Sequence, residues 1–406
     1  MTTEEALVVP GYITTDGVAH SKEKLAAVAS TLSAYSPRSI PCTTEADTWA
    51  YRCKCSFQIV QSNEDDGTWQ YALRHQGQVI PISTFPIATR RIQWAMKDLQ
   101  EFLTSDMKQN WTSVTFSSSW SNDQDCVLTM HYGQPLGGDG NWKHEAAILC
   151  EKMQLRQITG RSKKKLLVAR EGASSSSLWT RTDPLAILRD TLWLIAPSKD
   201  TEKWQVTLDK SKSTNIPVRY EKPEGAFYHP NANTMQEALA WMLNRLEAIA
   251  SRSNTGLHLL ELYSGCGAHT VALASSGLLS SITCVELDAR LVEACRVNCQ
   301  LNQLEEKVKV VSKDAGAYLT SQGLASNIIL VDPPKQGLDE SVCNVILNAC
   351  QCEDMLYISC GHQALERDLK LLHGSFEVVD AALTDLFPRT QSSVESLVHL
   401  RRRNRT

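Results

Sequence analysis

A thiol and two carboxylates stand at the ends of short apolar segments in the C-terminal part of this sequence. Asp332 follows Ile328–Val331 and precedes two prolines, Cys360 follows Met355–Ser359, and Glu395 begins a further apolar run. Two prolines fix a rigid, extended turn, which would hold Asp332 at one place. A cysteine beside the start of a helix has more of its nucleophilic thiolate form. The alternatives are a solvated Asp in a turn, a buried structural thiol and a surface Glu.

A glycine-rich turn and an acidic residue form a second candidate site. The turn is Ser264-Gly265-Cys266-Gly267, and Glu286 ends the next apolar segment. Glycines let the backbone pass close to a ligand, and a carboxylate about twenty residues further on can accept hydrogen bonds from ribose hydroxyls. The pattern indicates a nucleoside-containing cofactor, and both a dinucleotide and S-adenosylmethionine satisfy it. The alternative is a tight turn followed by an N-cap at Asp288.

Regular alternation of strand and helix patterns must position these residues. The expected strands are Leu257–Tyr263, Ser281–Glu286, Val308–Val311, Asn327–Val331 and Met355–Ser359. The expected helices lie near Thr270–Ser276, Ala289–Gln303, Ala315–Ser321, Glu340–Ala349 and Gln363–Leu372. This βα repetition predicts a doubly wound α/β fold with a parallel sheet, whose ligand lies beyond the carboxyl ends of the strands.

The rest of the chain divides into two further parts. Residues 49–222 combine alternating strand patterns with an amphipathic stretch at Thr89–Thr104, which predicts a mixed α/β domain. Residues 1–48 are expected to be a peripheral extension with a helix around Ser21–Ser33, and Ser174–Ser177 to be a mobile loop tip. The predicted boundaries are therefore 1–48, 49–222 and 223–406.

Composition excludes several classes of protein. The 406 residues carry a net charge of −4 and are 42% hydrophobic, which is typical of a globular chain with two or three domains. The 13 cysteines have no repeated C-x-x-C spacing, so we expect neither a disulfide framework nor a metal site. No segment has the pattern of a signal peptide or a membrane span, so we expect a reducing compartment, the cytoplasm or the nucleus, and no membrane partner.

Two basic segments are candidate RNA contacts despite the negative net charge. Seven Lys and Arg residues lie between Lys152 and Arg170, and the C-terminus carries Arg401–Arg403 and Arg405. Such density suits phosphate contacts, with a solvated loop and a nuclear targeting signal as the alternatives. Aromatic residues of the central domain could stack on bases, although strand alternation alone explains them as core.

Taken together, the motifs closely resemble those of the RNA (uracil-5-)-methyltransferases. The resemblance rests on LLELYSGCG, VELD, VDPPKQGLD, LYISCG and DLFPRT followed by VES, and upstream on Tyr51-Arg52 with Phe57, Phe85-Pro86 and Gly225–Asn231. An acidic or amide residue before two prolines is also used by base-modifying methyltransferases. The shorter N-terminal part resembles the tRNA-modifying branch of the family.

The resemblance implies a Rossmann-like S-adenosylmethionine-dependent methyltransferase domain and a central RNA-binding domain. It implies that Cys360 is the nucleophile that adds to carbon 6 of uracil and that Glu395 is the base that removes the proton from carbon 5. It assigns cofactor binding to His229, Tyr263, Gly265, Gly267, Glu286, Asp314 and Asp332. The chain departs from the family pattern at His229, Ala268, Gly361 and His362, and one extra residue precedes Glu395.

We therefore expect an enzyme that methylates carbon 5 of a uridine in RNA, in particular tRNA, with S-adenosylmethionine and no metal. It is expected to be monomeric. Two other functions remain open. An amine-directed RNA methyltransferase would use the Asp332 turn but would need no thiol, and the departures from the family pattern would suit a non-catalytic factor that binds or folds tRNA.

Overall fold

The structure is a computed structural model that divides the chain into two compact units. One unit is formed by the described parts of Thr48–Asp190 and by Lys222–Gly225, the other by the described parts of Asp16–Asp47, Thr191–Glu221 and Ala226–Thr406. The structure describes residues 16–36, 39–44, 49–61, 68–103, 106–122, 124–134, 139–163, 166–170, 187–198, 201–211, 216–226, 228–391 and 393–403.

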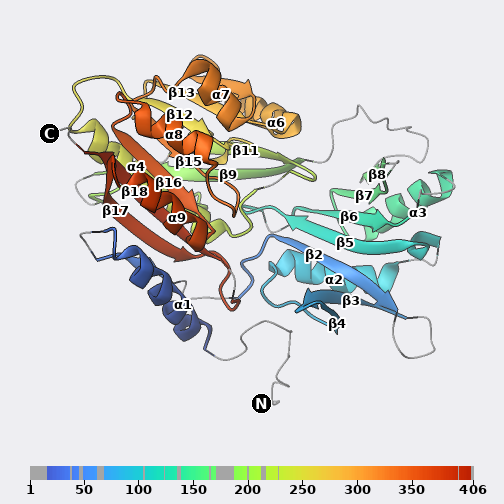
Figure 1. The fold of residues 1–406 in the computed structure, drawn as a ribbon. Coiled ribbons are helices and arrows are strands. Elements are labelled where there is room, and N and C mark those ends of the chain that lie inside the picture. Colours follow the sequence, from blue (N-terminus) through green and yellow to red (C-terminus); the bar gives the residue numbers. More distant parts are fainter. Residues whose placement is uncertain are drawn as a thin grey trace. The chain divides into compact units, whose positions relative to one another are not determined.

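The second unit contains an eight-stranded sheet in the order β1-β17-β18-β16-β15-β12-β13-β14 (Figure 1). Its strands are β1 (Cys42–Thr43), β12 (His258–Leu262), β13 (Ser281–Glu286), β14 (Val308–Ser312), β15 (Ile328–Val331), β16 (Asp354–Ser359), β17 (Phe376–Asp385) and β18 (Val394–Arg402). The five strands from β12 to β16 are parallel, as the sequence predicts. Strand β18 runs antiparallel to β16 and β17, so its first residues lie at the edge where β16 ends.

Helices cover both faces of this sheet. One group is α4 (Ala232–Ala250), α5 (Ala268–Ser275) and α6 (Ala289–Leu301), and the other is α1 (Gly17–Leu32), α7 (Ala315–Gln322), α8 (Glu340–Asn348) and α9 (His362–Leu372). The second group shares one hydrophobic core with the sheet, to which α1 contributes Leu25, Val28 and Leu32. These apolar residues recur at helical spacing, so α1 buries one face and leaves Lys22 exposed on the other.

The observed division differs from the predicted boundaries at residues 48 and 222. Helix α1 belongs to the second unit, because its apolar face completes the core of the eight-stranded sheet. The chain passes between the units within β9 (Ile187–Ile195) and β11 (Ile216–Pro223), which are neighbours in a three-stranded sheet with β10 (Gln205–Thr207). Residues 191–221 therefore also belong to the second unit, whereas the predicted central domain included them. Ser174–Ser177 lie outside the described residues.

The first unit is built on a seven-stranded sheet in the order β4-β3-β2-β5-β6-β7-β8. Its elements are β2 (Lys54–Gln61), β3 (Trp69–His75), β4 (Gln78–Ile82), α2 (Arg90–Phe102), η1 (Asp106–Lys108), β5 (Trp111–Ser118), β6 (Cys126–Tyr132), α3 (Asp139–Lys152), β7 (Gln157–Arg161) and β8 (Leu166–Arg170). Phe57, Tyr71 and Phe116 are buried against one another. These aromatic side chains are core, and the mixed α/β architecture matches the prediction.

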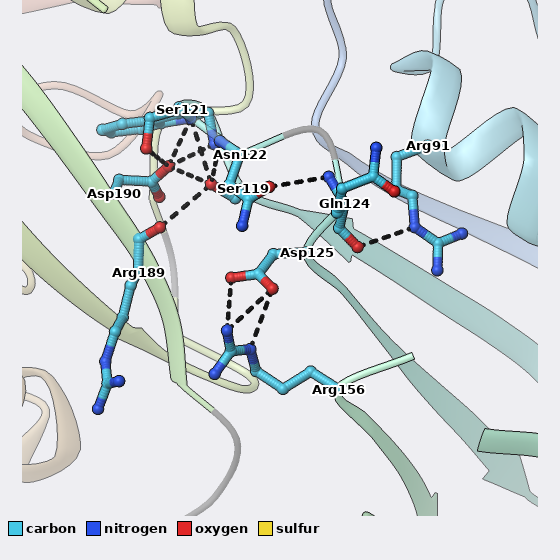
Figure 2. Close-up of polar contacts among 10 residues, drawn as sticks. Arg91, Ser119, Ser121, Asn122, Gln124, Asp125, Arg156, Arg189 and Asp190 are labelled. Carbon is cyan, nitrogen blue, oxygen red and sulfur yellow. Dashed lines mark hydrogen bonds and ion pairs between the residues drawn. The ribbon is translucent and has the colours of Figure 1, made fainter. Parts of the chain in front are cut away.

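A buried carboxylate organises the loop that follows β5 (Figure 2). Asp190 Oδ1 accepts hydrogen bonds from Ser119 Oγ at 2.6 Å and from the backbone N–H of Ser121 at 2.8 Å. Its other oxygen forms an ion pair with Lys222, whose ammonium also lies 3.6 Å from the centre of the Trp120 ring. Both charged side chains are almost fully buried, and burial of a charge is tolerated when it is paired and hydrogen-bonded in this way.

Candidate active site

Three of the sequence-predicted residues lie at one edge of the eight-stranded sheet. Asp332 directly follows β15 and Cys360 directly follows β16, and these parallel strands are paired through Val331 and Tyr357. Strand β18 enters at the same edge because it is antiparallel to β16, with Ser396 paired to Ser359. Glu395 therefore stands one residue from the end of β16, and the sheet topology brings the three groups together.

The pKa values of these three groups are shifted by burial and by the charges of their neighbours. Burial, and then the negative charges of Glu395 and Asp332, raise the pKa of the Cys360 thiol to about 11, while Lys335 opposes the shift. Burial and the charge of Asp332 raise the pKa of Glu395 to about 8, again opposed by Lys335. Burial raises the pKa of Asp332 to about 7. The thiol is therefore protonated near neutral pH, and the two carboxyl groups can each take up or release a proton there.

The loop after Asp332 packs closely against the start of α9. A Cβ on Gly361 would clash with the carbonyl oxygen of Lys335, so no larger residue fits without a shift of that backbone. This contact gives a local reason for glycine directly after Cys360. It also ties the backbone beside the thiol to the backbone that follows the two prolines.

Asp368 anchors the same loop from the side of α9, a role that no sequence pattern indicates. Its carboxylate is fully buried and accepts hydrogen bonds from Tyr357 Oη at 2.7 Å and from the backbone N–H of Leu338 at 2.8 Å. Arg367 donates to the same carboxylate at 2.7 Å and to the carbonyl oxygens of Gln336 and Leu338. The Asp368 side chain on α9 thus connects this helix to β16 and to the loop after Asp332.

The turn after β12 has the backbone conformation that a closely approaching ligand requires. Tyr263, Gly265 and Gly267 have φ values of 62°, 57° and 80°. No atom lies within 4 Å of a Cβ built on Gly265, so this side of the turn is open. A Cβ on Gly267 would lie 2.6 Å from Cys295 Sγ, so the second glycine permits close packing of the turn on α6.

Glu286 connects this turn to the end of β13. Its Oε2 accepts a hydrogen bond from the backbone N–H of Gly265 at 3.0 Å, and its Oε1 accepts one from the N–H of Asp288 at 2.8 Å. Each carboxylate oxygen has a further lone pair, so the side chain can also accept hydrogen bonds from two hydroxyl groups. The open turn and the fixed carboxylate fit the ribose and methionine parts of S-adenosylmethionine.

Asp314 and His229 have different surroundings. Asp314 is the exposed N-cap of α7, where it accepts a hydrogen bond from the N–H of Ala317 at 2.9 Å, and its charge is among those that raise the pKa of Tyr263 after burial. His229 Nδ1 donates to the carbonyl oxygen of Asn231 at 2.7 Å. Burial lowers the pKa of His229 to about 4, so the imidazole is neutral at physiological pH.

A buried acidic residue in β12 is a feature of the site that sequence reasoning missed. Glu261 is 1% exposed and accepts a hydrogen bond from Thr270 Oγ1 at 2.5 Å, with His269 Nδ1 at 3.8 Å. Burial raises its pKa well above the usual range, and the charge of Asp332 contributes. The signal that could have identified Glu261 is a carboxyl group among the leucines of a strand.

The basic segments are engaged within the protein to a larger extent than the sequence suggests. Arg156 forms an ion pair with Asp125 (Figure 2), and Arg161 forms one with Glu224. Near the C-terminus, Arg402 donates to the carbonyl oxygens of Ile346, Leu347 and Cys352. These guanidinium groups already bind other parts of the protein. Fewer positive charges are therefore available for phosphate contacts than the sequence of each basic segment suggests.

Two kinds of feature are absent from the described part of the chain. No group of three or more His, Cys, Asp or Glu side chains among those residues could hold a metal ion. Of the helices that the structure describes, none combines the length and the apolar character needed to cross a membrane.

Comparisons with known proteins agree on one family. A family model described as tRNA (Uracil-5-)-methyltransferase matches residues 17–178 and 207–403. The tRNA/tmRNA (uracil-C(5))-methyltransferase of Campylobacter lari is 27% identical over 396 residues, covering 94% of this chain and 99% of that protein. The enzyme of the same name from Stutzerimonas stutzeri is 29% identical over 375 residues, covering 87% and 88%.

A solved structure has the same fold. The Pyrococcus abyssi tRNA (uracil-54, C5)-methyltransferase in complex with S-adenosyl-L-homocysteine superposes with a TM-score of 0.64. The match covers 94% of this chain and 84% of that chain at 15% sequence identity. The predicted fold class, a Rossmann-like methyltransferase domain joined to a mixed α/β domain, is confirmed.

Proposed function

The chain belongs to the tRNA (uracil-5-)-methyltransferase family, and from this premise we propose that it methylates carbon 5 of a uridine in tRNA through a covalent adduct with Cys360. The methyl donor in this proposal is S-adenosylmethionine. The observation that carries the proposal is the convergence of Cys360, Glu395 and Asp332 at one edge of the sheet, where their charges alter one another's pKa values.

Cys360 makes carbon 5 reactive in the first step. Carbon 5 of uracil is a weak nucleophile until a group adds to carbon 6. The sulfur of Cys360 forms a bond to carbon 6, and the electron pair of the C5=C6 bond becomes an enolate that ends on oxygen 4. The thiol must first lose its proton, and burial holds its pKa high. Asp332 can accept this proton, because it titrates near neutral pH.

S-adenosylmethionine, when bound, would supply an electrophilic methyl group to carbon 5, with S-adenosylhomocysteine as the leaving group. Tyr263, Gly265 and Gly267 would pass close to the cofactor, and Glu286 would accept hydrogen bonds from its ribose. Asp314 would stand near the adenine, and Asp332 would lie between cofactor and uracil. These assignments follow the order of the strand ends along the sheet.

Glu395 completes the reaction as a general base. After methyl transfer, carbon 5 carries both the methyl group and its original hydrogen. Glu395 removes that hydrogen as a proton, the electron pair of the C5–H bond re-forms C5=C6, and the bond from carbon 6 to the Cys360 sulfur breaks. The side chain is 5% exposed, which limits competition from water for the proton.

Nucleoside mass spectrometry tests the proposal directly. Unmodified tRNA transcripts are incubated with the protein and S-adenosylmethionine bearing a labelled methyl group, and the RNA is digested to nucleosides. We expect labelled 5-methyluridine from the wild type and from Cys350→Ala, which alters an exposed cysteine, and none from Cys360→Ala. Undiminished methylation by Cys360→Ala would contradict the covalent route.

Trapping with 5-fluorouridine in the tRNA separates the proposal from the two alternatives. Fluorine at carbon 5 cannot be removed as a cation by Glu395, so the adduct with Cys360 should persist and migrate slowly in a denaturing gel. An amine-directed methyltransferase would give no such band and would leave a methylated exocyclic amine in the RNA. A non-catalytic factor would bind the tRNA without binding S-adenosylmethionine in calorimetry.

A further inference from the structure

Helix α1 was predicted from the sequence to be peripheral. In the structure, the ammonium group of its Lys24 binds the turn between β17 and β18. Lys24 Nζ forms an ion pair with Asp385 and donates hydrogen bonds to the carbonyl oxygens of Phe387 at 3.1 Å and Thr390 at 3.0 Å. An ammonium group has three N–H donors, and these three acceptors can use all of them. The Lys24 side chain is 11% exposed and that of Asp385 is fully buried.

Two further residues of α1 hold the same turn. Ser21 Oγ donates to Asp385 Oδ2 at 2.5 Å, while Asp385 Oδ1 also accepts from the backbone N–H of Phe387 at 3.1 Å. His20 Nε2 donates to the carbonyl oxygen of Thr390 at 3.2 Å. One turn of helix therefore supplies three side chains to a segment more than 360 residues away in the chain.

The turn that α1 holds leads directly to Glu395. Strand β17 ends at Asp385 and β18 begins at Val394, and the pairing of the two strands places Glu395 opposite Thr384. Within the turn, Arg389 has a φ of 63°, a conformation that costs energy for a residue with a side chain. External contacts are therefore needed to keep the turn in this shape.

We propose that Lys24 is a positioning residue for Glu395, acting through Asp385 and the carbonyl oxygens of Phe387 and Thr390. This inference rests on the proposed function, because it assigns Glu395 the removal of the proton from carbon 5. Lys24 itself touches neither uracil nor cofactor in this scheme. Its role is to fix the turn, so that the carboxylate stays within reach of carbon 5.

The sequence of the reaction steps predicts a specific kinetic effect when this positioning role is lost. Cys360 lies between β16 and α9 and forms its bond to carbon 6 without help from the turn. Glu395 acts after methyl transfer, so displacement of the turn should slow the release of the adduct more than its formation. A variant that disturbs the turn should accumulate the covalent protein–RNA species, whereas general loss of folded protein would reduce it.

Lys24→Met tests the inference, with Lys22→Met on the exposed face of the same helix as its control. Hydrogen exchange followed by mass spectrometry should show exchange on the order of tenfold faster over residues 386–391 in Lys24→Met alone. On tRNA with S-adenosylmethionine, kcat should fall by about 10–100-fold, and the fraction of covalent adduct in a denaturing gel should rise. The affinity for S-adenosylmethionine in calorimetry should not change.

Unchanged exchange over residues 386–391 together with a wild-type adduct fraction would overturn the inference. If Lys24→Met does not fold, His20→Ala removes one donor to the turn and should give the same changes to a smaller extent; wild-type behaviour of a folded His20→Ala would then count against it. Absence of 5-methyluridine from the wild type would instead refute the proposed function, and the exchange measurement would still decide whether α1 fixes the turn.

Discussion

The carboxylate of Glu286 accepts a hydrogen bond from the backbone N–H of Gly265 at 3.0 Å, which joins the end of β13 to the turn after β12. The other carboxylate oxygen accepts from the N–H of Asp288 at 2.8 Å. The acceptor proposed for the cofactor ribose is therefore held on both sides by backbone groups before any ligand binds. Such preorganisation reduces the entropy lost on binding.

Glu286→Gln should weaken binding of S-adenosylmethionine by about 10–100-fold, as expected for the loss of charge-assisted hydrogen bonds. The amide nitrogen of Gln cannot accept a hydrogen bond, so one backbone N–H also loses its partner. Calorimetry with S-adenosylmethionine measures the change. Glu293→Gln, an exposed carboxylate on α6, is the control and should bind as the wild type does. Equal affinity of Glu286→Gln and wild type would refute the role of Glu286.

Gly267→Ala should destabilise the second unit more than Gly265→Ala. Both substitutions place a Cβ at a positive φ, which costs about 1–2 kcal/mol. At Gly267 the new methyl group would also lie 2.6 Å from Cys295 Sγ, whereas nothing lies within 4 Å at Gly265. Urea denaturation measures both costs. Adding Cys295→Ala should recover part of the loss for Gly267→Ala, and no recovery would show that the clash is not its cause.

Asp368→Asn should lower kcat without changing the affinity for S-adenosylmethionine. The amide cannot accept from Tyr357, Arg367 and the N–H of Leu338 together, and one unsatisfied buried group costs about 1–3 kcal/mol. The loop that follows Asp332 would then lose its anchor beside Cys360. Steady-state kinetics and calorimetry measure the two quantities, and Tyr357→Phe, which removes one hydrogen bond, should have a smaller effect. A weaker cofactor affinity with unchanged kcat would contradict this assignment.

The doubly wound part of the fold could be predicted because its signals are local. Each of β12 to β16 is a short apolar run followed by a helical pattern, and Asp332 and Cys360 directly follow their strands. The carboxyl ends of parallel strands meet at one edge, so the candidate site followed from the order of the elements. The family motifs then supplied the role of Glu395.

Contacts between distant segments could not be predicted in this way. Nothing near Lys24 in the sequence indicates that its ammonium binds the turn at Phe387–Thr390, so helix α1 was predicted to be a peripheral extension. In the same way, the charge of Arg156 and Arg161 was visible in the sequence, but their acidic partners were not. Pairing depends on the tertiary fold, whereas strand and helix patterns depend on neighbouring residues.

The rate at which free methylated tRNA forms should rise with pH from about 6 to about 9, because two groups must lose protons. Glu395 acts as a base only when ionised, and its pKa is about 8. Cys360 attacks only as the thiolate, and burial raises its pKa to about 11. Both active fractions therefore increase with pH across this range. Single-turnover rates on tRNA at fixed ionic strength measure the profile, and a maximum at or below pH 6 would contradict it.

Glu395→Gln should make the protein more stable at alkaline pH while blocking release of the adduct. The pKa of Glu395 is raised from 4.5 to about 8 on folding, so the folded state binds the proton more tightly than the unfolded chain. The stability of the wild type therefore falls as pH rises from about 4.5 through about 8, whereas a neutral amide has no such dependence. At pH 9 the free energy of unfolding of the variant should exceed that of the wild type by about 1–3 kcal/mol. This is the cost of burying a polar group whose lost contacts with water are not fully replaced. At pH 4 both carry a neutral side chain and should unfold at similar urea concentrations. Greater stability of the wild type at pH 9 would show that the Glu395 carboxylate is stabilised by a partner in the fold.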